Sequence, residues 1–408
     1  MSSRDFVYRK FAEFYGDPST PIPSPAMLNQ REFGFLLFKE HIMLRHKIFA
    51  NINDLRLFLG EIVPSDVYYS IAYYDNPEAE MDKKGWLGAD LVFDIDADHI
   101  PTACDKYHDE WICKNCGLTD KGMPPKRCPK CDGARFDTKT WPCERCLDSA
   151  KEETTKLIDM LRNDFGFSDE EIQVFFSGHR GYHVHIENDT VKSIDAMGRK
   201  EIVDYIIGLG LTIANRRKVG QKGKKINERF FLSDFAWDRR IKLGMRRFIL
   251  NSTAEDLKKA GIGNTSTAIL RNKDLMVKRG IDEGRWSSVK GVKVGTWRKL
   301  AEYVKEAESS KIDTVVTTDT HRLIRMNGTL HGKTGLKKVE FPVKHLADFD
   351  PFEEAVAFKG GAVKVFVSDA PKFRLGGSGF GPYKEQTVEV PTAAAVLLIC
   401  KDRAEVAT

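Results

Sequence analysis

The sequence predicts a mixed α/β protein with an inserted metal-binding module and a helical subdomain. Its 408 residues, 41% hydrophobic and 10% aromatic, are enough for two or three globular domains. Apolar runs of strand length at 91–96, 172–176 and 362–367 occur together with helical periodicity at 150–165. The region 195–300 is charged, helical in pattern and poor in strand signal, and most cysteines cluster in one short segment. Strands and helices therefore share one chain around a cysteine-rich insertion.

The composition limits the class of protein. The net charge of +5, from 64 basic and 59 acidic residues, permits a nucleic-acid partner without establishing one. The first residues have no apolar core of signal-peptide type, and no run approaches the about 18 apolar residues of a membrane span. We therefore expect an intracellular, cytoplasmic protein that does not contact a membrane.

Residues 91–99 place carboxylates at every second position of an apolar run. Because side chains alternate along a strand, Asp94 and Asp96, and Asp98 if the strand extends that far, would share one face while apolar side chains pack on the other. Mg²⁺ takes oxygen ligands from one or two carboxylates and from substrate phosphates, so the pattern suits phosphoryl transfer. The alternative is an edge strand with an acidic, solvated face.

Seven of the eight cysteines lie between positions 104 and 146, a spacing that indicates metal binding. Cys113 and Cys116 form one C-x-x-C knuckle, and Cys128 and Cys131 form a second one, with eleven residues between the two. A glycine follows each knuckle and would let the backbone turn so that both thiolates face one ion. This is a zinc-ribbon pattern, with four thiolates around one Zn²⁺.

A third pair, Cys143 and Cys146, has Cys104 and His108 as the unassigned ligands nearby. A second zinc ion held by these four residues would complete the count, and neither site leaves an open position for water, so both ions would be structural. Spacing also permits an interleaved pairing, in which Cys113 and Cys116 join Cys143 and Cys146. One equivalent of bound zinc would contradict the two-site prediction.

Two further segments have the residue types of anion sites. Residues 177–186 combine two turn glycines with Arg180 and His183, and residues 322–335 place Arg325 and His331 between glycine-containing turns. Glycines let backbone amides approach an anion while arginine and histidine donate hydrogen bonds, which favours a phosphate site. A plain hairpin with a polar turn is the alternative for the first segment.

Two remaining segments concern local structure and charge. Ser168 and the acidic residues after it suit the beginning of a helix. Residues 216–225 are strongly basic and could contact a polynucleotide backbone, although a solvated surface loop is the simpler explanation.

Three blocks together resemble a known family, the small, catalytic subunit of archaeal and eukaryotic DNA primases. They are FDIDADH at 93–99, SGHRGYHVH at 177–185, and Asp313 followed by RLIRMNGTLHGKTGL at 322–336. The blocks occur in the order of the family, and the cysteine cluster follows the first block as it does there. The match extends from the REF at 31–33 to about residue 345.

The resemblance implies roles for individual residues. Two catalytic divalent ions, Mg²⁺ or Mn²⁺, would be held by Asp94, Asp96 and Asp313, whereas Asp98 is not among the family's ligands. The incoming nucleoside triphosphate would be bound by residues of the second and third blocks, namely Ser177, Arg180, His183, Arg325 and His331. The family often has tryptophan where this chain has His185, so no role is carried over to that residue.

The family's zinc knuckle matches Cys104, His108, Cys143 and Cys146, in agreement with the assignment made from spacing. The ribbon of Cys113, Cys116, Cys128 and Cys131 is additional to the common pattern. Binding of single-stranded template is one hypothesis for the ribbon, and scaffolding of a loop is the other.

The implied fold is a primase-type catalytic core with an RRM-like sheet. We expect the core in residues 1–102, 147–194 and 301–390, the zinc-binding module in 103–146, the helical subdomain in 195–300 and a C-terminal tail in 391–408.

The implied activity is that of a DNA-dependent nucleotidyltransferase, which synthesises short primers de novo on single-stranded DNA from nucleoside triphosphates and releases pyrophosphate. The implied partner is a large, iron–sulfur subunit in a heterodimer, and the implied location is the cytoplasm in association with the nucleoid. The alternatives are a primer-extending or end-joining polymerase of the same superfamily and a noncatalytic zinc-ribbon protein that binds nucleic acid.

Overall fold

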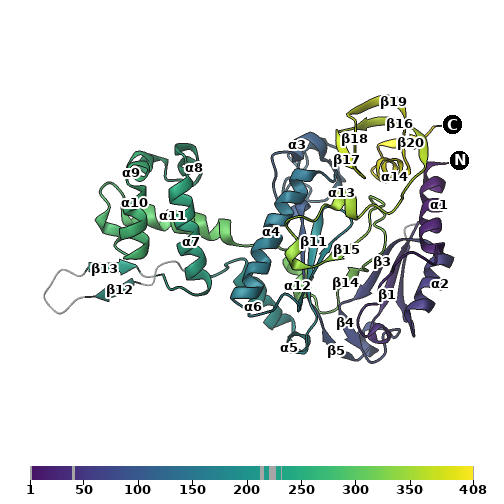
Figure 1. Ribbon diagram of the computed structural model, residues 1–408, viewed down its shortest axis with the longest axis horizontal. Helices are drawn as coiled ribbons and strands as arrows, with labels where there is room; N and C mark the ends of the chain where they lie inside the picture. Colours follow the sequence, from purple (N-terminus) through teal and green to yellow (C-terminus); the bar gives the residue numbers. More distant parts are fainter. Residues whose placement is uncertain (1, 39–41, 212–215, 220–226, 231, 408) are drawn as a thin grey trace. The chain divides into compact units, whose positions relative to one another are not determined.

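The computed structural model describes residues 2–38, 42–211, 216–219, 227–230 and 232–407, and it divides into two compact units (Figure 1). Unit 1 comprises residues 1–155, 168–200 and 312–408, and unit 2 comprises residues 156–167 and 201–311. Both units contain strands and helices, which confirms the mixed α/β fold class. No helix among the described residues is long and apolar enough to cross a membrane.

The first sheet of unit 1 has the strand order β14-β3-β1-β2. Helices α1 and α2 pack against each other, and α1 also contacts β3. Phe33 and Phe35 of β1 are fully buried, so the apolar side of this antiparallel sheet forms part of the core. The elements are α1 (Ser3–Gly16), β1 (Phe33–Leu37), β2 (Met43–Lys47), α2 (Ile52–Ile62), β3 (Pro64–Ser70) and β14 (Leu323–Arg325). After β3 in the chain, β4 (Ala72–Tyr74) and β5 (Trp86–Ala89) form a separate two-stranded sheet.

The second sheet has the order β15-β10-β11-β6, and each neighbouring pair is antiparallel. Strands β10 and β11 form a hairpin whose turn holds residues 177–180, and β11 pairs with the acidic strand β6. The predicted strand at 172–176 is confirmed as β10. The strands are β6 (Leu91–Asp96), β10 (Ile172–Phe176), β11 (Gly181–Ile186) and β15 (Val339–Phe341). Helix α12 (Thr314–Thr318) packs against β6, whereas α5 (Asp189–Lys192) contacts β5 and α13 (Pro351–Glu354) contacts the later strand β17 (Phe373–Leu375).

The C-terminal part of unit 1 is a three-stranded sheet, β19-β16-β20, that packs on helix α14 (Figure 1). Residues 394–398 of α14 are fully buried because the helix also contacts α1. The region expected as a tail therefore contributes an apolar helix to the core. The elements are β16 (Ala362–Ala370), β17 (Phe373–Leu375), β18 (Ser378–Phe380), β19 (Tyr383–Pro391), α14 (Thr392–Cys400) and β20 (Ala404–Val406).

The cysteine-rich segment forms a small sheet, β8-β7-β9, after the short helix α3. Trp111, Cys113 and Cys128 are buried together, with Phe136 packed against them. The elements are α3 (Asp105–His108), β7 (Glu110–Cys113), β8 (Thr119–Lys121) and β9 (Phe136–Lys139). Such a small apolar core is typical of a module that depends on bound metal for stability.

Unit 2 is mainly helical, as its sequence pattern predicts. The stacked indole rings of Trp286 and Trp297, 5.6 Å apart, lie in its core. Its elements are the greater part of α6 (Ala196–Ile206), β12 (Arg216–Val219), β13 (Asn227–Phe230), α7 (Ala236–Asn251), α8 (Ala254–Lys259), α9 (Ser266–Arg271), α10 (Lys273–Leu275), a π-helix (Met276–Asp282) and α11 (Val294–Glu308). Lys222, Lys224 and Lys225 of the basic segment lie outside the described residues.

The helix predicted at 150–165 is present as part of α4 (Glu144–Asn163). The prediction of a helix beginning at Ser168 is wrong, because residues 169–171 form a turn that leads directly into β10. The backbone N–H of Ser168 donates to the Glu171 carboxylate at 2.9 Å. The serine and acid of this pattern thus stabilise a turn, since the same side-chain to backbone hydrogen bonds serve helix ends and turns alike.

Candidate active site

The three predicted metal carboxylates lie on two adjacent segments of unit 1. Asp94 and Asp96 extend from β6, and Asp313 is the residue that precedes α12. The backbone N–H of Asp313 donates to the carbonyl oxygen of Asp94 at 2.8 Å, which fixes the two segments side by side. The Asp313 carboxylate accepts from Val315 N–H at 2.9 Å and so caps α12. The structure therefore brings together residues that are more than two hundred positions apart in the sequence.

These carboxylates repel one another. Burial, together with the charges of Asp96 and Asp313, raises the pKa of Asp94 to about 7. Converging carboxylates of this kind fit a divalent cation, which would remove the repulsion and supply a counter-charge. Among the described residues, however, the carboxylate oxygens of Asp94, Asp96 and Asp313 do not all lie within 4.8 Å of one another. The three carboxylates are therefore farther apart than the ligands of a compact metal site.

Asp98 does not continue the alternating pattern of the strand. Strand β6 ends at Asp96, whose carboxylate accepts from Asp98 N–H at 2.9 Å and begins the short 3-10 turn Ala97–His99. The Asp98 carboxylate pairs instead with Arg180 at 2.8 Å. Periodicity alone predicted that the strand continues to Asp98, and this is wrong because the carboxylate of Asp96 caps a turn and ends the strand. Asp98 still lies near Asp96, because one ligand atom of each of Asp96, Asp98 and His179 lies within 4.8 Å of the other two.

His183 connects the acidic strand with the predicted triphosphate segments. It lies directly across from Asp94 in the β11–β6 pairing, and its Nε2 atom is 3.5 Å from an Asp94 carboxylate oxygen. Burial lowers the pKa of His183 well below its ordinary value, and the charges of Lys338, Arg325 and other bases lower it further. His183 is therefore a neutral side chain between the acidic and the basic groups of the site.

Ser177 shapes the turn between β10 and β11. Its hydroxyl accepts from the backbone N–H groups of His179 and Gly181, both at 3.3 Å. Gly178 has φ +87°, and a Cβ atom there would lie 3.0 Å from the Cβ of His331. The glycine is needed for both reasons, since a side chain would strain the backbone and push the two predicted triphosphate segments apart.

Arg325 and His331 are held by a residue that the sequence did not indicate. The Arg325 guanidinium pairs with the carboxylate of Asp66 at 2.5 Å, and it donates to Tyr68 at 3.3 Å. Asp66 also accepts from Gly332 N–H at 3.0 Å, and His331 lies 3.8 Å away. Although Asp66 is buried, Arg325 and His331 hold the pKa of its carboxyl well below the ordinary value. Asp66 lies in the apolar strand β3, where no local motif marks it.

Arg180 is buried at the end of the turn and joins it to the cysteine-rich module. Its guanidinium pairs with Asp98 and with Asp109, at 2.8 and 2.7 Å, and it donates to Cys146 Sγ at 3.3 Å. Asp109 in turn contacts Nδ1 of His108 at 2.6 Å, an arrangement that orients a histidine metal ligand. The geometry assigns Arg180 a role in supporting the knuckle, while its contact with a triphosphate stays a prediction.

The cysteines and histidine gather into two groups that could each hold a metal ion. Each group has its ligand atoms within 4.8 Å of one another, and the two groups are Cys104, His108, Cys143 and Cys146, and Cys113, Cys116, Cys128 and Cys131. The ribbon cysteines thus form one group and the knuckle residues the other, and Cys113 and Cys116 do not join Cys143 and Cys146. Neighbouring sulfur atoms within each group lie 3.4 to 3.7 Å apart. Tetrahedral Zn²⁺ with bonds of about 2.3 Å requires sulfurs about 3.8 Å apart, so both groups fit zinc.

The two ribbon knuckles turn differently. Gly117 follows the first knuckle with φ +70°, as the pattern predicts. In the second knuckle the left-handed residue is Asp132, with φ +57°, and not Gly133. Asp132 tolerates this conformation better than most residues, and its carboxylate pairs with Arg127 at 2.6 Å. A Cβ at Gly133 would lie 2.7 Å from the Asn115 amide, so this glycine provides space between the knuckles.

Comparison with known proteins shows which family the chain belongs to. A family model described as DNA primase small subunit matches residues 132–343. The chain is 32% identical to the DNA primase small subunit PriS of Nitrosopumilus maritimus, with 98% of each chain covered. The chain belongs to the DNA primase small subunit family. Its identity to the PriS proteins of Methanococcoides burtonii and Archaeoglobus fulgidus is 34% and 31%, with 99% and 98% of each chain covered. The resemblance carried by the three sequence blocks is confirmed, and this family member has all three blocks within one unit.

Proposed function

We propose that this primase small subunit is the catalytic, DNA-dependent nucleotidyltransferase that synthesises primers de novo on single-stranded DNA. The observation that carries the proposal is the pairing of β6 with β11, which sets the carboxylate of Asp94 against His183 and the basic groups beyond it. Phosphoryl transfer depends on positioning and on neutralising the charge of the phosphates. An acidic cluster beside a basic one supplies both requirements.

Two divalent ions, Mg²⁺ or Mn²⁺, would be held by Asp94, Asp96 and Asp313. When bound, such ions lower the pKa of the attacking hydroxyl and neutralise the leaving pyrophosphate. The protein's own contribution is to position the charges. Ser177, Arg180, His183, Arg325 and His331 would bind or orient the triphosphate, and Asp66 keeps Arg325 and His331 in place.

The other assignments follow from the family and the geometry together. Two structural zinc ions would stabilise the module of residues 103–146, because its apolar core is small. We propose that unit 1 holds the catalytic core and this module, and that unit 2 is the helical subdomain. A large, iron–sulfur subunit would complete the heterodimer, and replication at the nucleoid would be the setting.

The test is synthesis on unprimed single-stranded DNA with labelled ribonucleotides and deoxynucleotides, in Mg²⁺ and in Mn²⁺. Asp96→Asn should abolish incorporation while leaving the melting temperature nearly unchanged, because it removes a metal ligand from a partly exposed position. Asp82→Asn is the matched control, since this carboxylate is exposed and is not one of the residues predicted to bind metal or nucleotide. Continued primer synthesis by Asp96→Asn would refute the assignment.

The same assay separates the alternatives. An extending or end-joining polymerase would elongate a supplied primer and fail to join two free nucleotides. A noncatalytic binding protein would keep its affinity for DNA in chelator and incorporate no nucleotide with either metal.

A further inference from the structure

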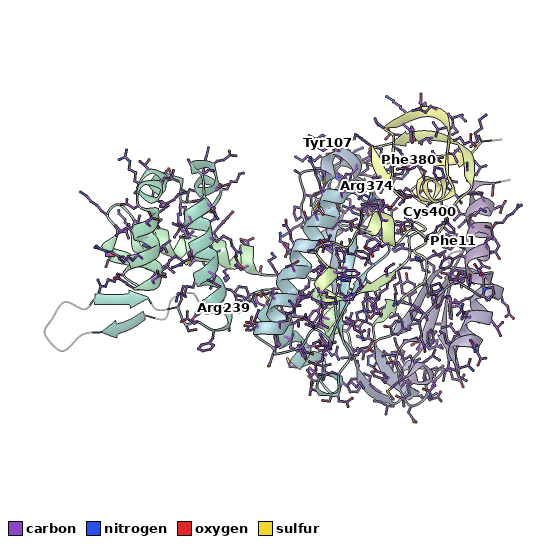
Figure 2. All side chains as sticks on the ribbon, in the orientation of Figure 1. Phe11, Tyr107, Arg239, Arg374, Phe380 and Cys400 are labelled. Atoms are coloured by element: carbon purple, nitrogen blue, oxygen red, sulfur yellow. The ribbon has the colours of Figure 1, made fainter. Side chains whose placement is uncertain are left out.

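Lys401 reaches the predicted triphosphate site from the opposite end of the chain. It immediately follows α14, whose last residue, Cys400, is labelled in Figure 2. The Lys401 residue is 9% exposed, and its Nζ atom lies 2.6 Å from Nε2 of His179, in the turn between β10 and β11. His179 is itself buried, at 6% exposed. The Lys401 side chain thus contacts the turn of residues 177–180, which is predicted to bind the triphosphate.

The surroundings of Lys401 are predominantly basic. The ring of His179 stacks on that of His331 at 5.0 Å, and the charges of Arg180 and Lys333 are close enough to lower the pKa of Lys401. The acidic side chain whose charge opposes them is Asp98, and Asp98 is already paired with Arg180 at 2.8 Å. Among the residues that the structure describes, no carboxylate forms an ion pair with Lys401.

Such an arrangement is unfavourable unless an anion is present. Burial is the main reason that the pKa of Lys401 falls to about 7, with the neighbouring positive charges adding to it. A buried ammonium group without a carboxylate partner costs free energy, and an apolar side chain of similar length would fit the site at lower cost. The excess of positive charge around Lys401 therefore favours a ligand that carries several negative charges.

The packing of α14 holds Lys401 in this position. A Cβ atom at Gly335 would lie 2.4 Å from a methyl group of Val396, so the loop after His331 is in direct contact with the helix. The backbone N–H of Lys401 donates to the carbonyl of Leu397 at 3.0 Å and closes the last turn. Because α14 is buried and this loop packs against it, the backbone of Lys401 is fixed beside the turn that contains His179.

We propose that Lys401 binds the terminal phosphates of the nucleoside triphosphate, in one anion-binding site with Lys333 and with the ring N–H groups of His179 and His331 as hydrogen-bond donors. This inference rests on the proposed function and adds a C-terminal residue to the nucleotide-binding segments. The ligand class is set by the chemistry, since several clustered cationic and hydrogen-bonding groups match a triphosphate better than a single phosphate. Nucleoside monophosphates should therefore gain little from Lys401.

The experiment compares Lys401→Met and Lys401→Arg with the wild type in the full-length chain. Binding of ATP and of AMP is measured by calorimetry with Mg²⁺ present, and the melting temperature is measured without nucleotide. We expect Lys401→Met to weaken ATP binding by about 10-fold to 100-fold, the loss of one charge-assisted hydrogen bond, and to leave AMP binding unchanged. Lys401→Arg should retain most of the ATP affinity. Lys384→Met is the control, because Lys384 is an exposed lysine of β19.

The melting temperature separates a ligand role from a structural one. Lys401→Met should melt at the same temperature as the wild type or higher, because it removes a buried charge. Unchanged ATP affinity in Lys401→Met, or equal weakening of ATP and AMP binding, would overturn the proposal. If Lys401→Met does not fold, the same comparison between Lys401→Gln and Lys401→Arg decides. Failure of the wild type to incorporate nucleotides on a template would instead refute the proposed function, and the difference in ATP binding would still be measurable.

Discussion

Replacing Asp94 by asparagine should stabilise the protein whenever no divalent ion is bound. Burial and the charges of Asp96 and Asp313 raise the pKa of Asp94 from 3.8 to about 7. A carboxyl group with a raised pKa in the folded state destabilises that state once it must ionise, because the unfolded chain ionises more easily. Asparagine has nearly the same shape and carries no charge, so the substitution removes the penalty.

The size of the effect follows from the pKa values. A difference of roughly three pKa units corresponds to about 4 kcal/mol at about 1.36 kcal/mol per unit. The side chain of Asp94 is 24% exposed, and solvent screening reduces this to on the order of 2 kcal/mol. The sign depends on pH. Near pH 4 the wild type and Asp94→Asn should be equally stable, the advantage of Asp94→Asn should grow as the pH rises toward 7, and it should be constant above that.

The assay is thermal unfolding from pH 4 to pH 9 in buffer that retains zinc and lacks Mg²⁺ and Mn²⁺. At pH 8 we expect Asp94→Asn to melt about 2 °C above the wild type, because the unfolding entropy of a chain of this size is large. Added Mg²⁺ should raise the melting temperature of the wild type more than that of Asp94→Asn, because the ion stabilises the state that binds it. The control Asp82→Asn should match the wild type throughout. A melting temperature of Asp94→Asn equal to or below that of the wild type at pH 8 would refute the reasoning.

Three further substitutions test other parts of the site. Asp66→Asn should lower the stability by about 3 kcal/mol and raise the KM for nucleotides, because it leaves the buried Arg325 without its partner; unchanged urea unfolding would contradict this. Cys113→Ser should lower the zinc content, measured by elemental analysis, from two equivalents to one, whereas loss of both would indicate a shared site. Arg180→Met should speed the release of zinc to a chelator, because it removes the partner that orients Asp109 beside the knuckle. An unchanged rate would contradict the role of Arg180 in supporting the knuckle and leave triphosphate binding as its predicted role.

The local patterns of the sequence predicted the parts of the site that are built from neighbouring residues. Strand β10 was predicted at its bounds, and Cys104 and Cys146 were assigned to one metal group, because hydrophobic periodicity and ligand spacing depend on short stretches of chain. The two errors in this part have a common cause. At Ser168 and at Asp98 a side chain forms a hydrogen bond with nearby backbone and selects a turn, which periodicity does not register.

Residues that serve the site from distant elements carry no local signal. Asp66 lies in an apolar strand and Lys401 follows an apolar helix, and each reads as an isolated charge beside a hydrophobic run. Their significance depends on tertiary packing, which places Asp66 against Arg325 and Lys401 against His179. In both cases the informative property is burial of a charge, since a chain bears that cost where the charge meets a partner or a ligand. Asp66 has its partner within the protein. Lys401 has no such carboxylate among the described residues, and this difference makes an anionic substrate the better explanation for the lysine.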